Sequence, residues 1–339
     1  MAKHAGFRTR MAIGQGSAWG YAVEATKRLQ FLSESVDHDP DIQDDQSLMG
    51  DSGFNEQVLG NEKNEGQIEI PMQYGGNADA LLAAAMGASV AGTHSPTDYY
   101  QWDFSLLEPS DFFSLAIDKS VHVHEIASAM VVGFELEALA KGRMIFRPTL
   151  RGKAYSNDSV TNTAATMDSA DVSAAAQVLM SHARFFFGDN ANALDVAIPS
   201  DDEIKIRRFK LSVDWQMDEV YTNQGLFIPA QNNRRIVTVE LGKTSLDTEN
   251  WRDWQRGKTD MQLAAVFSTT VAGQTHFLKF HLGKCRVFGV PDATSGPEKL
   301  MPDITLRGLR AAEGSTTWAT MTEELEIQTQ NALDSNPLS

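Results

Sequence analysis

A short sequence echo constrains this chain more than any other feature. Thr149-Leu150-Arg151-Gly152 follows a strand-like segment, and Thr305-Leu306-Arg307-Gly308 follows a similar one. An earlier marker repeats in the same order, because Ser35-Val36-Asp37 precedes the first echo and Ser212-Val213-Asp214 precedes the second. Two collinear echoes at a long period indicate that one structural unit occurs twice in the chain.

The segments between the echoes also correspond. In the first copy the alternating run Gln67–Met72 leads into a helix-like segment, Asn77–Met86, which ends at Gly87. In the second copy Arg235–Leu241 leads into the helix-like segment Asp247–Gln255. Each copy is therefore expected to contain a strand, then a short helix, and then further strands that end at the echo.

The first copy is the longer one. Ser35 and Thr149 are 114 positions apart, whereas Ser212 and Thr305 are 93 apart, a difference of 21 residues. We expect the extra residues in the polar segment 37–66. This segment is too polar to form a core, so it is interpreted as a mobile arm or as a loop that a neighbouring chain orders.

Period-two alternation predicts the fold class. Val132, Phe134 and Leu136 alternate with Glu135 and Glu137, which is the pattern of a strand with one buried face. Similar runs recur along both copies, and hairpins with one apolar face pack over a core. We therefore predict a mainly β (α+β) fold with two tandem β-sandwich or barrel domains, each flanked by a short helix.

The domain boundaries follow from the repeat and from composition. At 339 residues the chain is long enough for two domains that each bury a core. We place the first domain at 1–155, including the acidic loop at 37–66, and the second at 183–322. Residues 156–182 are rich in Ser, Thr, Ala and Asn and are interpreted as a linker, with a short helix at Ser173–Met180. Residues 323–339 form a C-terminal tail.

The net charge is unevenly placed. The whole chain carries −16, and residues 34–139 hold 20 acidic residues against two basic ones, Lys63 and Lys119, so that segment carries −18 and the remainder +2. Proteins that grip nucleic acid show the opposite sign, because Lys and Arg neutralise phosphates. The first copy is therefore expected to repel a polyanion.

Cysteine content and hydropathy give further exclusions. Cys285 is the only cysteine, so there is no intrachain disulfide, and assembly in a reducing cytoplasm is expected. Its apolar strand favours a small core residue over a nucleophile. No apolar run approaches the roughly 18 to 20 residues that span a bilayer, and the basic N-terminus lacks the apolar stretch of a secretory signal.

Two glycine-containing segments lack a glycine that the motifs they resemble require. Gly242-Lys243-Thr244 resembles the end of a phosphate-binding loop, but Val237 stands where that loop requires another glycine. Gly14-Gln15-Gly16 lacks the third glycine of a dinucleotide fingerprint, because Trp19 occupies its place. Both motifs are interpreted as turns, and we expect neither a cofactor nor catalysis.

The candidate calcium ligands do not complete a calcium-binding loop. Asp37, Asp39 and Asp41 have the first spacings of a calcium loop, but Ile42 and Leu48 stand where Gly and Glu are required.

His122 and His124 share a strand face beside Glu125, but no third ligand occurs at a spacing that is typical of a metal site. Exposed or interface histidines are the preferred interpretation there, and also for His276 and His281. No metal site is predicted.

At this point several segments together resemble a known family, the major tail tube proteins of long-tailed bacteriophages. The segments are Gly16–Gly20 with its Trp19-Gly20 pair, the strand that ends at Ser33–Asp37, the acidic insert, and Gly66–Gly87 with Asn77–Leu82 followed by Met86-Gly87. The likeness covers Gly14–Gly152 and, through the repeat, much of the second half. The duplication departs from the simplest members and leaves the number of chains per ring open.

The resemblance implies a β-sandwich with a flanking helix, whose sheets join around a ring. Stacked rings would form the tail tube of a siphovirus-like virion, made and assembled in the host bacterial cytoplasm, through which genomic DNA passes without specific binding. Its partners would be the tape measure protein, the tail terminator and the tail-tip proteins. Because one chain carries two units, three chains give six, so we favour a pseudo-hexameric trimer, with a hexamer as the alternative.

The resemblance also suggests roles for acidic residues. Carboxylates on the polar side of alternating strands are lumen candidates that would repel DNA in transit: Glu69, Glu135, Glu137 and Glu240. The long loop would reach the neighbouring ring through its aspartates: Asp37, Asp39, Asp41, Asp44, Asp45 and Asp51.

Two alternatives stay open at the level of sequence. A carbohydrate-binding or hydrolytic β-sandwich would use Trp102, Trp251 and Trp254 as a sugar-stacking platform, although aromatic residues near turns are more often core or interface anchors. A secretion-system tube shares the architecture of the tail tube and is not separated from it by sequence physics.

Overall fold

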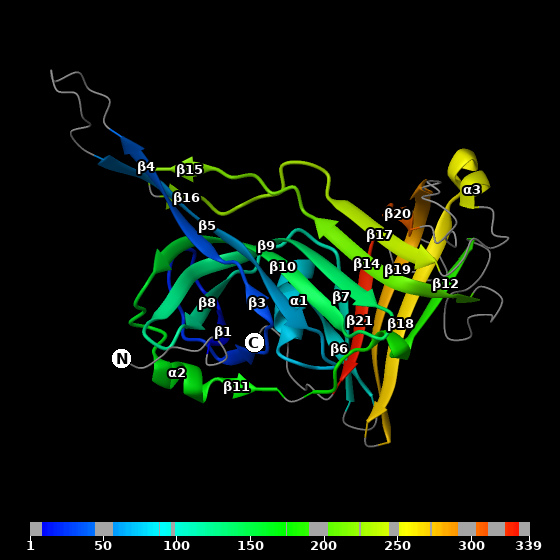
Figure 1. Cartoon of the computed structure of the whole chain (residues 1–339), viewed down its shortest axis with the longest axis horizontal. Coiled ribbons are helices and arrows are strands. Elements are labelled where there is room, and N and C mark those ends of the chain that lie inside the picture. The colour runs from blue at the N-terminus through cyan, green and yellow to red at the C-terminus, as the bar shows by residue number, and fades with distance from the viewer. Residues whose placement is uncertain are drawn as a thin grey trace, which may run out of the picture.

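Strands make up most of the chain in the computed structural model, which confirms the predicted mainly β fold (Figure 1). The structure describes residues 9–44, 57–87, 89–95, 99–173, 175–189, 203–223, 225–243, 251–271, 273–290, 303–310 and 323–331. Within these ranges no helix is long and apolar enough to cross a membrane.

The first half forms one antiparallel sheet. Its strands are β1 (Arg10–Gln15), β3 (Ser33–Glu34), β4 (Asp37–Asp44), β5 (Gln57–Pro71), β8 (Phe113–Asp118), β9 (Val123–Leu139) and β10 (Met144–Ser156). They pair in the order β1–β8–β9–β10–β5, and β3 and β4 follow one another along the outer edge of β5.

The second half pairs its strands in the same order. They are β12 (Ala183–Asp189), β14 (Ile206–Asp214), β17 (Ile236–Lys243), β18 (Met261–Val271), β19 (Gln274–Gly289) and β20 (Asp303–Gly308). The antiparallel order is β12–β18–β19–β20–β17–β14. Each of these strands therefore has a counterpart in the first half with the same neighbours.

Register shifts fall at matching places in the two ladders. The ladder of β10 on β9 shifts at the Thr-Leu step of the first echo, where the partner changes from Gly133 to Val131. The ladder of β20 on β19 shifts at the Thr-Leu step of the second echo, where the partner changes from Gly289 to Val287. A bulge bends and twists its strand locally, so the two echoes occupy matching positions in their sheets.

The earlier Ser-Val-Asp marker is not equivalent between the halves. Gln67 and Glu240 face the threonines of the two echoes. The Ser35 backbone N–H donates to Gln67 O at 2.9 Å, whereas the residue opposite Glu240 is Lys210 rather than Ser212. Ser35 therefore corresponds to Lys210, and the two Ser-Val-Asp segments are offset by two positions. Their similarity does not reflect equivalent positions in the two halves.

Strand β14 joins the two halves edge to edge. Strand β8 pairs with β9 only as far as Ala129, which leaves the rest of that edge of β9 open. Strand β14 occupies it, from Arg208 opposite Leu139 to Asp214 opposite Gly133. One sheet therefore runs through β5, β10, β9, β14, β17 and β20 across both halves of the chain.

Two helices pack behind this sheet. Helix α1 (Ala78–Met86) is buried along its whole length and ends at Gly87, which has the left-handed φ of 77°. Helix α3 (Trp251–Gly257) follows β17 as α1 follows β5. The helix that ends at Gly87 is confirmed, and for the second helix the expected start at Asp247 lies outside the described residues.

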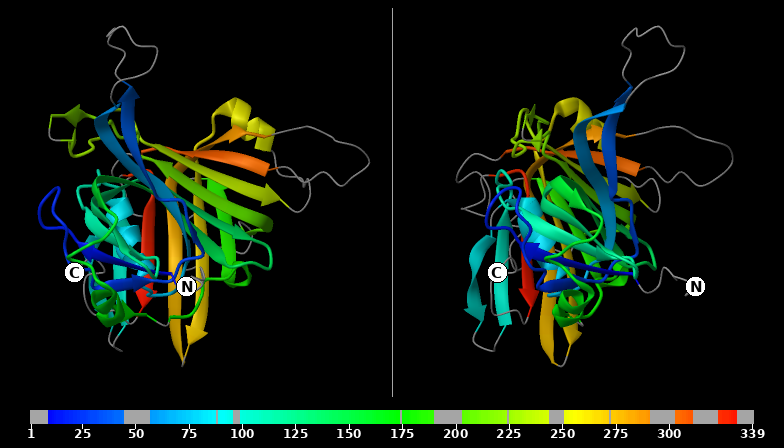
Figure 2. Two further views of the ribbon diagram at one scale, coloured as in Figure 1. Left: turned by 60° about the vertical axis from the view of Figure 1, so that its left-hand side comes forward. Right: turned by 90° about the vertical axis from the view of Figure 1, so that its left-hand side faces the viewer.

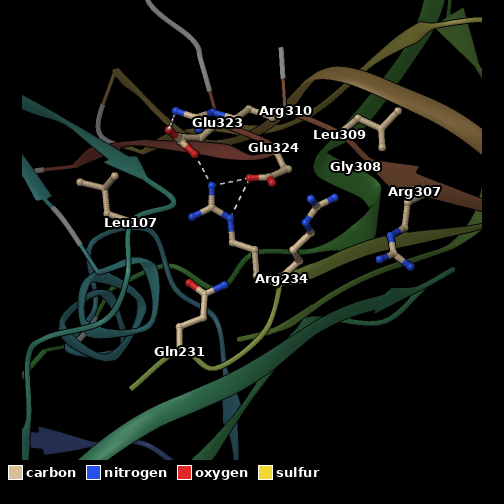
Figure 3. A pocket seen from close by; sticks show the side chains of 10 residues that line it. Leu107, Gln231, Arg234, Arg307, Gly308, Leu309, Arg310, Glu323 and Glu324 are labelled. Atoms are coloured by element: carbon tan, nitrogen blue, oxygen red, sulfur yellow. Dashed lines mark hydrogen bonds and ion pairs between the residues drawn. The ribbon is translucent and has the colours of Figure 1, made fainter. Parts of the chain in front are cut away.

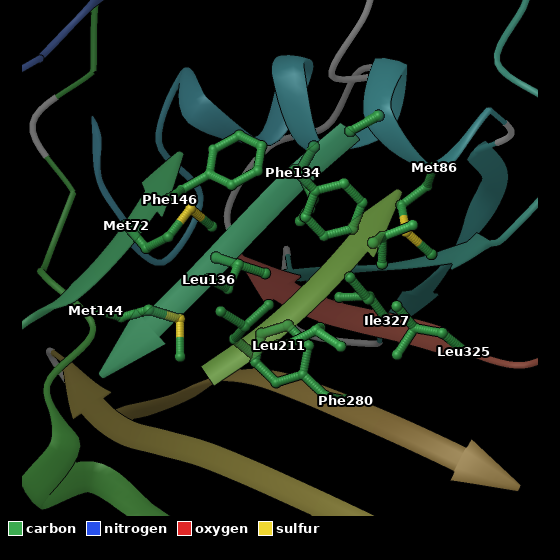
Figure 4. Close-up of a cluster of buried hydrophobic side chains, with 14 of the residues drawn as sticks. Met72, Met86, Phe134, Leu136, Met144, Phe146, Leu211, Phe280, Leu325 and Ile327 are labelled. Atoms are coloured by element: carbon green, nitrogen blue, oxygen red, sulfur yellow. The ribbon is translucent and has the colours of Figure 1, made fainter. Parts of the chain in front are cut away.

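The two halves share one hydrophobic core. Figure 4 shows Phe134 and Leu136 of β9 close to Leu211 of β14 and Phe280 of β19, with Met86 of α1 to the right of Phe134. The same buried cluster contains residues from both halves. Burial of this apolar surface is the main stabilising contribution to the fold, and it ties the halves to each other.

The extra length of the first half lies in an inserted hairpin, β6 (Ser89–Ser95) and β7 (Tyr99–Ser105). There are 26 residues between α1 and β8 but only 3 between α3 and β18. The acidic segment contributes little, since Asp37 and its partner Glu65 are 28 positions apart and Ser212 and Thr238 are 26 apart. The expectation that segment 37–66 holds the extra residues is therefore wrong.

The insertion extends the sheet of the second half. Strand β21 (Glu326–Asn331) pairs with β19 on one side and with β7 on the other, and β7 pairs with β6. The described part of the expected C-terminal tail is thus a strand between the halves. Its backbone groups gain partners on both sides.

The expected linker packs against the first half. It contains α2 (Ala164–Ser169), β11 (Asp171–Val172) and the 3-10 helix η2 (Met180–His182), and β11 pairs in parallel with β2 (Lys27–Leu29), which also pairs with β1. Its buried Asn162 side chain binds the Ala25 N–H at 2.7 Å and the Val23 carbonyl at 2.9 Å. The helix expected at Ser173–Met180 is wrong, because the described residues there are extended up to η2.

Two hairpin arms project from the same side of the molecule (Figure 2). One is the acidic segment, where β4 pairs with β5 as far as Asp44 opposite Gln57. The other lies between β14 and β17 and contains β15 (Tyr221–Thr222) and β16 (Gly225–Leu226). The remaining short strand, β13 (Glu203–Ile204), pairs with β12. The described part of the acidic segment is therefore a strand ladder rather than an irregular loop.

We predict that Gly87→Ala destabilises the protein by about 3 kcal/mol or more, because an alanine there has a strained left-handed φ and must also displace its neighbours. An added Cβ would lie 2.1 Å from the Leu107 carbonyl oxygen. Gly225→Ala is the matched control, since Gly225 has a φ of 86° but nothing within 4 Å of the added Cβ, and it should cost about 1 kcal/mol. Chemical denaturation of both variants checks this, and equal costs would contradict it.

Candidate functional site

The candidate site is the polar face of the joined sheet. Burial alternates along β9, where Phe134 and Leu136 are buried while Glu135 and Glu137 are partly exposed on the opposite face. The same alternation runs along β10, β14, β17 and β20. Because side chains of a strand point alternately to the two faces, one face of this sheet packs on the core and the other forms a continuous polar surface.

The four glutamates proposed from sequence lie on strands of this one sheet. Glu69 is on β5, Glu135 and Glu137 are on β9, and Glu240 is on β17. The sequence alternation therefore identified members of one surface that spans both halves. Their exposure to the lumen of an assembled tube stays a prediction.

Each of these carboxylates faces a cation. Arg147 of β10 lies between Glu69 at 2.7 Å and Glu137 at 2.9 Å. Arg208 of β14 lies between Glu137 at 2.9 Å and Glu240 at 3.3 Å. The ion pairs thus form an alternating row across β5, β10, β9, β14 and β17, which we call the charge ladder. A further pair, Lys210 with Glu135 at 2.8 Å, crosses the junction between the halves.

The pKa values follow these contacts. For Glu137, burial alone would raise the pKa, but hydrogen bonds from Arg147 and Arg208 outweigh it and hold the pKa below its usual value. For Glu69, hydrogen bonds from Arg147 and from the Ser33 hydroxyl lower the pKa. Both carboxylates are therefore charged at neutral pH and bound to their partners.

Sequence reasoning did not single out Arg147, Arg208 or Lys210. A usable signal was present, because Arg147, Thr149 and Arg151 alternate with buried residues of β10 in the way that Glu135 and Glu137 alternate on β9. What the sequence does not contain is the register that sets these cations beside the carboxylates.

The second arm contacts the first half through an ionic cluster. Arg151 of β10 binds Glu219, which precedes β15, at 2.5 Å and lies 3.9 Å from Glu65 of β5. Lys63 pairs with Glu65 at 2.9 Å and lies 3.9 Å from Glu219. The cluster holds the β15–β16 arm beside the acidic arm, as their adjacency in Figure 1 also shows.

The aspartates proposed as contacts between rings fall on the acidic arm. Asp37, Asp39 and Asp41 lie on β4, and Asp44 is its last residue. Asp45 and Asp51 lie outside the described residues. Placement on a projecting hairpin is compatible with an intermolecular role, which stays a prediction.

A second polar feature lies at the C-terminal end of β20 (Figure 3). It is a cavity of about 740 Å³ lined by Arg234, Arg235, Arg307 and Arg310 together with Glu323 and Glu324. Arg235 binds both glutamates, and Arg310 lies 3.3 Å from Glu323. Arg307 makes no ion pair with any residue that the structure describes. Four guanidinium groups against two carboxylates leave this cavity electropositive.

The sugar-platform alternative is contradicted by burial. Trp102 is 5% exposed and Trp251 is 3% exposed, so neither ring offers a face to a ligand. Trp251 stacks on Phe187 with ring centroids 4.8 Å apart, and Trp254 packs edge-on against Trp251. These rings are core anchors of the second half.

Other candidate ligands are also structural. Within the described ranges, no group of three or more His, Cys, Asp or Glu side chains is arranged to hold a metal ion. His276 and His281 are buried rather than exposed, and burial lowers the pKa of His281 well below its usual value. Cys285 is fully buried, and burial raises the pKa of its thiol. It is thus the small core residue that its strand predicted.

The joined sheet thus has one apolar face, one ion-paired polar face and two projecting arms, which defines an architecture of the mainly β class. Comparison with protein families is more specific, because a family described as phage tail tube protein matches residues 6–308. The chain therefore belongs to that family, which makes it a self-assembling structural component of a bacteriophage tail. No curated protein matches the chain.

We predict that Glu137→Gln lowers the free energy of unfolding by about 2 kcal/mol at pH 7, because two arginines lose a charged partner in a partly buried site. Since the folded-state pKa of Glu137 is lowered, its contribution is present above the usual carboxylate pKa and is lost as the pH falls through the folded value. The difference between variant and wild type should therefore shrink below about pH 4. Urea denaturation at pH 7 and pH 3.5 measures both effects.

Glu240→Gln is the matched control for this prediction. Among the described residues Glu240 has one ion-pair partner, Arg208 at 3.3 Å, and its side chain is 36% exposed. Its loss should cost less than about 0.5 kcal/mol. Equal effects of the two substitutions would contradict the role of Glu137 as the centre of the charge ladder.

Proposed function

We propose that three copies of this chain close into a ring of six similar modules, and that the rings stack into the tail tube of a long-tailed, siphovirus-like bacteriophage. Each chain contributes one module from residues 1–155 and one from 183–322, connected by 156–182 and followed by the tail 323–339. The tube is a passage for genomic DNA during ejection. The protein has no catalytic role and needs no cofactor.

The observation that carries this proposal is the repeated strand order, with register shifts at the same step of both echoes. Matching neighbours and matching bulges are what an internal duplication leaves behind, because bulges are kept as part of the backbone design. With two modules in one chain, three chains provide the six modules of a closed ring.

The junction between β9 and β14 supports the way in which the ring is built. It joins the two modules of one chain through a strand ladder rather than through side chains alone. Exposed strand edges must be paired or covered, and repetition of the same ladder around a ring pairs all of them. The polar face of the joined sheet then lines the tube, with Glu69, Glu135, Glu137 and Glu240 on it.

The charge ladder determines how such a lining would interact with the phosphates of DNA. The charge ladder and the adjoining Lys210–Glu135 pair together contain four carboxylates and three cations, so these residues carry a small net negative charge rather than a large one. Each arginine is held by carboxylates and is not available to phosphates. Passage without binding therefore rests on the internal pairing of the cations as much as on like-charge repulsion.

The arms are proposed as contacts between stacked rings, with the acidic arm contributing Asp37, Asp39, Asp41, Asp44, Asp45 and Asp51. The proposed partners at the tube ends and inside it are the tail terminator, the tail-tip proteins and the tape measure protein. The chain is made and assembled in the host bacterial cytoplasm and ends in the virion. The family match favours a phage tail over a secretion-system tube of the same architecture.

The test is electron microscopy of the purified protein at high concentration, combined with native mass spectrometry of the smallest closed species. We expect hollow filaments or annuli whose end-on averages show six lobes made by three chains. Six chains per ring would reject the trimer and keep the tube. Absence of any closed or filamentous species when tail-tip proteins are supplied would reject the proposed function.

A further inference from the structure

Each echo places an arginine at the same point of its sheet. Arg151 and Arg307 are the third residues of the two echoes, two positions after the threonines at which the registers shift. Both alternate with buried residues of their strands, so both lie on the polar face of the joined sheet. Arg307 is therefore the counterpart of Arg151.

Carboxylates neutralise Arg151 in the first half. Its guanidinium binds Glu219 at 2.5 Å, and Glu65, the residue opposite it on β5, lies 3.9 Å away. The residue opposite it on β9 is the uncharged Met130. The first half thus shows which ligand an arginine at this position takes, namely a carboxylate.

The same position in the second half has no such carboxylate among the described residues. The residue opposite Arg307 on β17 is Thr238, where the first half has Glu65. The residue opposite it on β19 is Arg286, which is itself bound by Asp260 at 2.5 Å. Like charges directly opposite one another destabilise a strand pair. A negative group beside Arg307 would therefore offset a repulsion as well as form an ion pair.

The acids of the neighbouring cavity are held by other arginines (Figure 3). Glu324 accepts a hydrogen bond from Arg235 Nε at 2.7 Å, and Glu323 binds both Arg235 and Arg310. These two glutamates fix Arg235 at the start of β17, and neither of them pairs with Arg307.

Two cations of the cavity remain without a carboxylate from the described part of the chain. Arg234 and Arg307 line it, and neither makes an ion pair within the described ranges. The cavity volume of about 740 Å³ is in the range of sites that hold organic ligands. A guanidinium group binds a carboxylate through two parallel hydrogen bonds, so two guanidinium groups suit a ligand with two carboxylates.

We propose that this cavity binds a pair of carboxylates, one on Arg307 and one on Arg234, supplied by a small dicarboxylic acid or by two acidic side chains of a protein segment. The site is formed by a single chain and does not depend on ring closure or stacking. It is a binding function in addition to the structural function proposed above.

Charge and the internal counterpart favour this ligand. Four arginines less two glutamates leave the cavity lining with a net charge of plus two, which matches a ligand with two negative charges. Guanidinium groups bind carboxylates and phosphates with similar geometry, so phosphate is the necessary comparison. The choice of carboxylate follows from the first half, where Arg151 takes Glu219.

The first experiment is a titration of the dilute full-length chain with glutarate, followed by the arginine Nε–H signals in NMR spectra of the isotope-labelled protein. We expect the signals of Arg234 and Arg307 to shift in one saturable step, with acetate and inorganic phosphate binding at least about 10-fold more weakly. Arg307→Gln should weaken glutarate binding about 10-fold, read at the Arg234 signal. Arg256→Gln, on the exposed surface of α3, should leave it within about 2-fold.

The second experiment restores the arrangement of the first half. Thr238→Glu places a carboxylate opposite Arg307, as Glu65 lies opposite Arg151. The new carboxylate should occupy Arg307 and weaken glutarate binding about 10-fold. Thr238→Gln is the matched control, because it has the same size without the charge, and it should bind glutarate within about 2-fold of the wild type. Melting curves show whether each variant is folded.

A Glu-Gly-Glu peptide with blocked ends distinguishes the two sources of the carboxylates. If it shifts the Arg307 signal at least as tightly as glutarate and a Gln-Gly-Gln peptide does not, the natural ligand is a protein segment. If glutarate binds and the peptide does not, the ligand is a small acid.

Three results would overturn the site. These are the absence of a saturable shift with glutarate and with the peptide, equal binding of glutarate by the Thr238→Glu and Thr238→Gln variants, and tighter binding of inorganic phosphate than of glutarate. None of them bears on ring formation, which is observed by electron microscopy of concentrated protein. The carboxylate site and the proposed function can therefore fail separately.

Discussion

The fold depends on the antiparallel ladder between β9 and β14. It makes one sheet from two halves, and its register decides which side chains face the core and which face outward. Because side chains alternate with a period of two, a slip of one residue would bury Glu135 and Glu137 and expose Phe134 and Leu136. The apolar cost of such a slip fixes the register, and the register in turn brings Arg208 and Lys210 of β14 to the carboxylates of β9. Shared core and charge ladder are thus two consequences of one backbone arrangement.

The half-buried strand and the helix end were predictable because each depends on a short stretch of sequence. Alternation along residues 132–137 identified a half-buried strand and its polar face, and Gly87 marked a helix end because a left-handed residue there favours glycine. The cationic partners of the ladder could not be predicted in the same way. Arg147 and Arg208 are 61 positions apart in the chain, and their meeting at Glu137 depends on two strand registers that no short window contains.

A polar composition did not mean an absence of regular structure in this chain. Segment 37–66 is polar in sequence, yet the backbone groups of its described residues are paired along β4 and β5. The linker 156–182 is likewise packed despite its polar composition, since its anchors are single side chains such as the buried Asn162 and Met167. The place of the inserted hairpin β6–β7 in the sheet is not predictable from local pattern, because it depends on β21, which lies more than 200 positions further along the chain.

The structure shows where the acidic and basic residues lie in the two halves of the chain. Residues 34–139 carry −18 and the remainder +2, and at the junction β14 of the second half supplies cations to β9 of the first. The glutamates of the ladder are therefore balanced from within the same chain. The aspartates of β4 lie on the outer edge of the first half, while Arg307, which makes no ion pair with any described residue, lies in the second half. The acidic strand β4 and the cationic cavity therefore belong to different halves of the chain, a separation that the net charge of the whole sequence does not reveal.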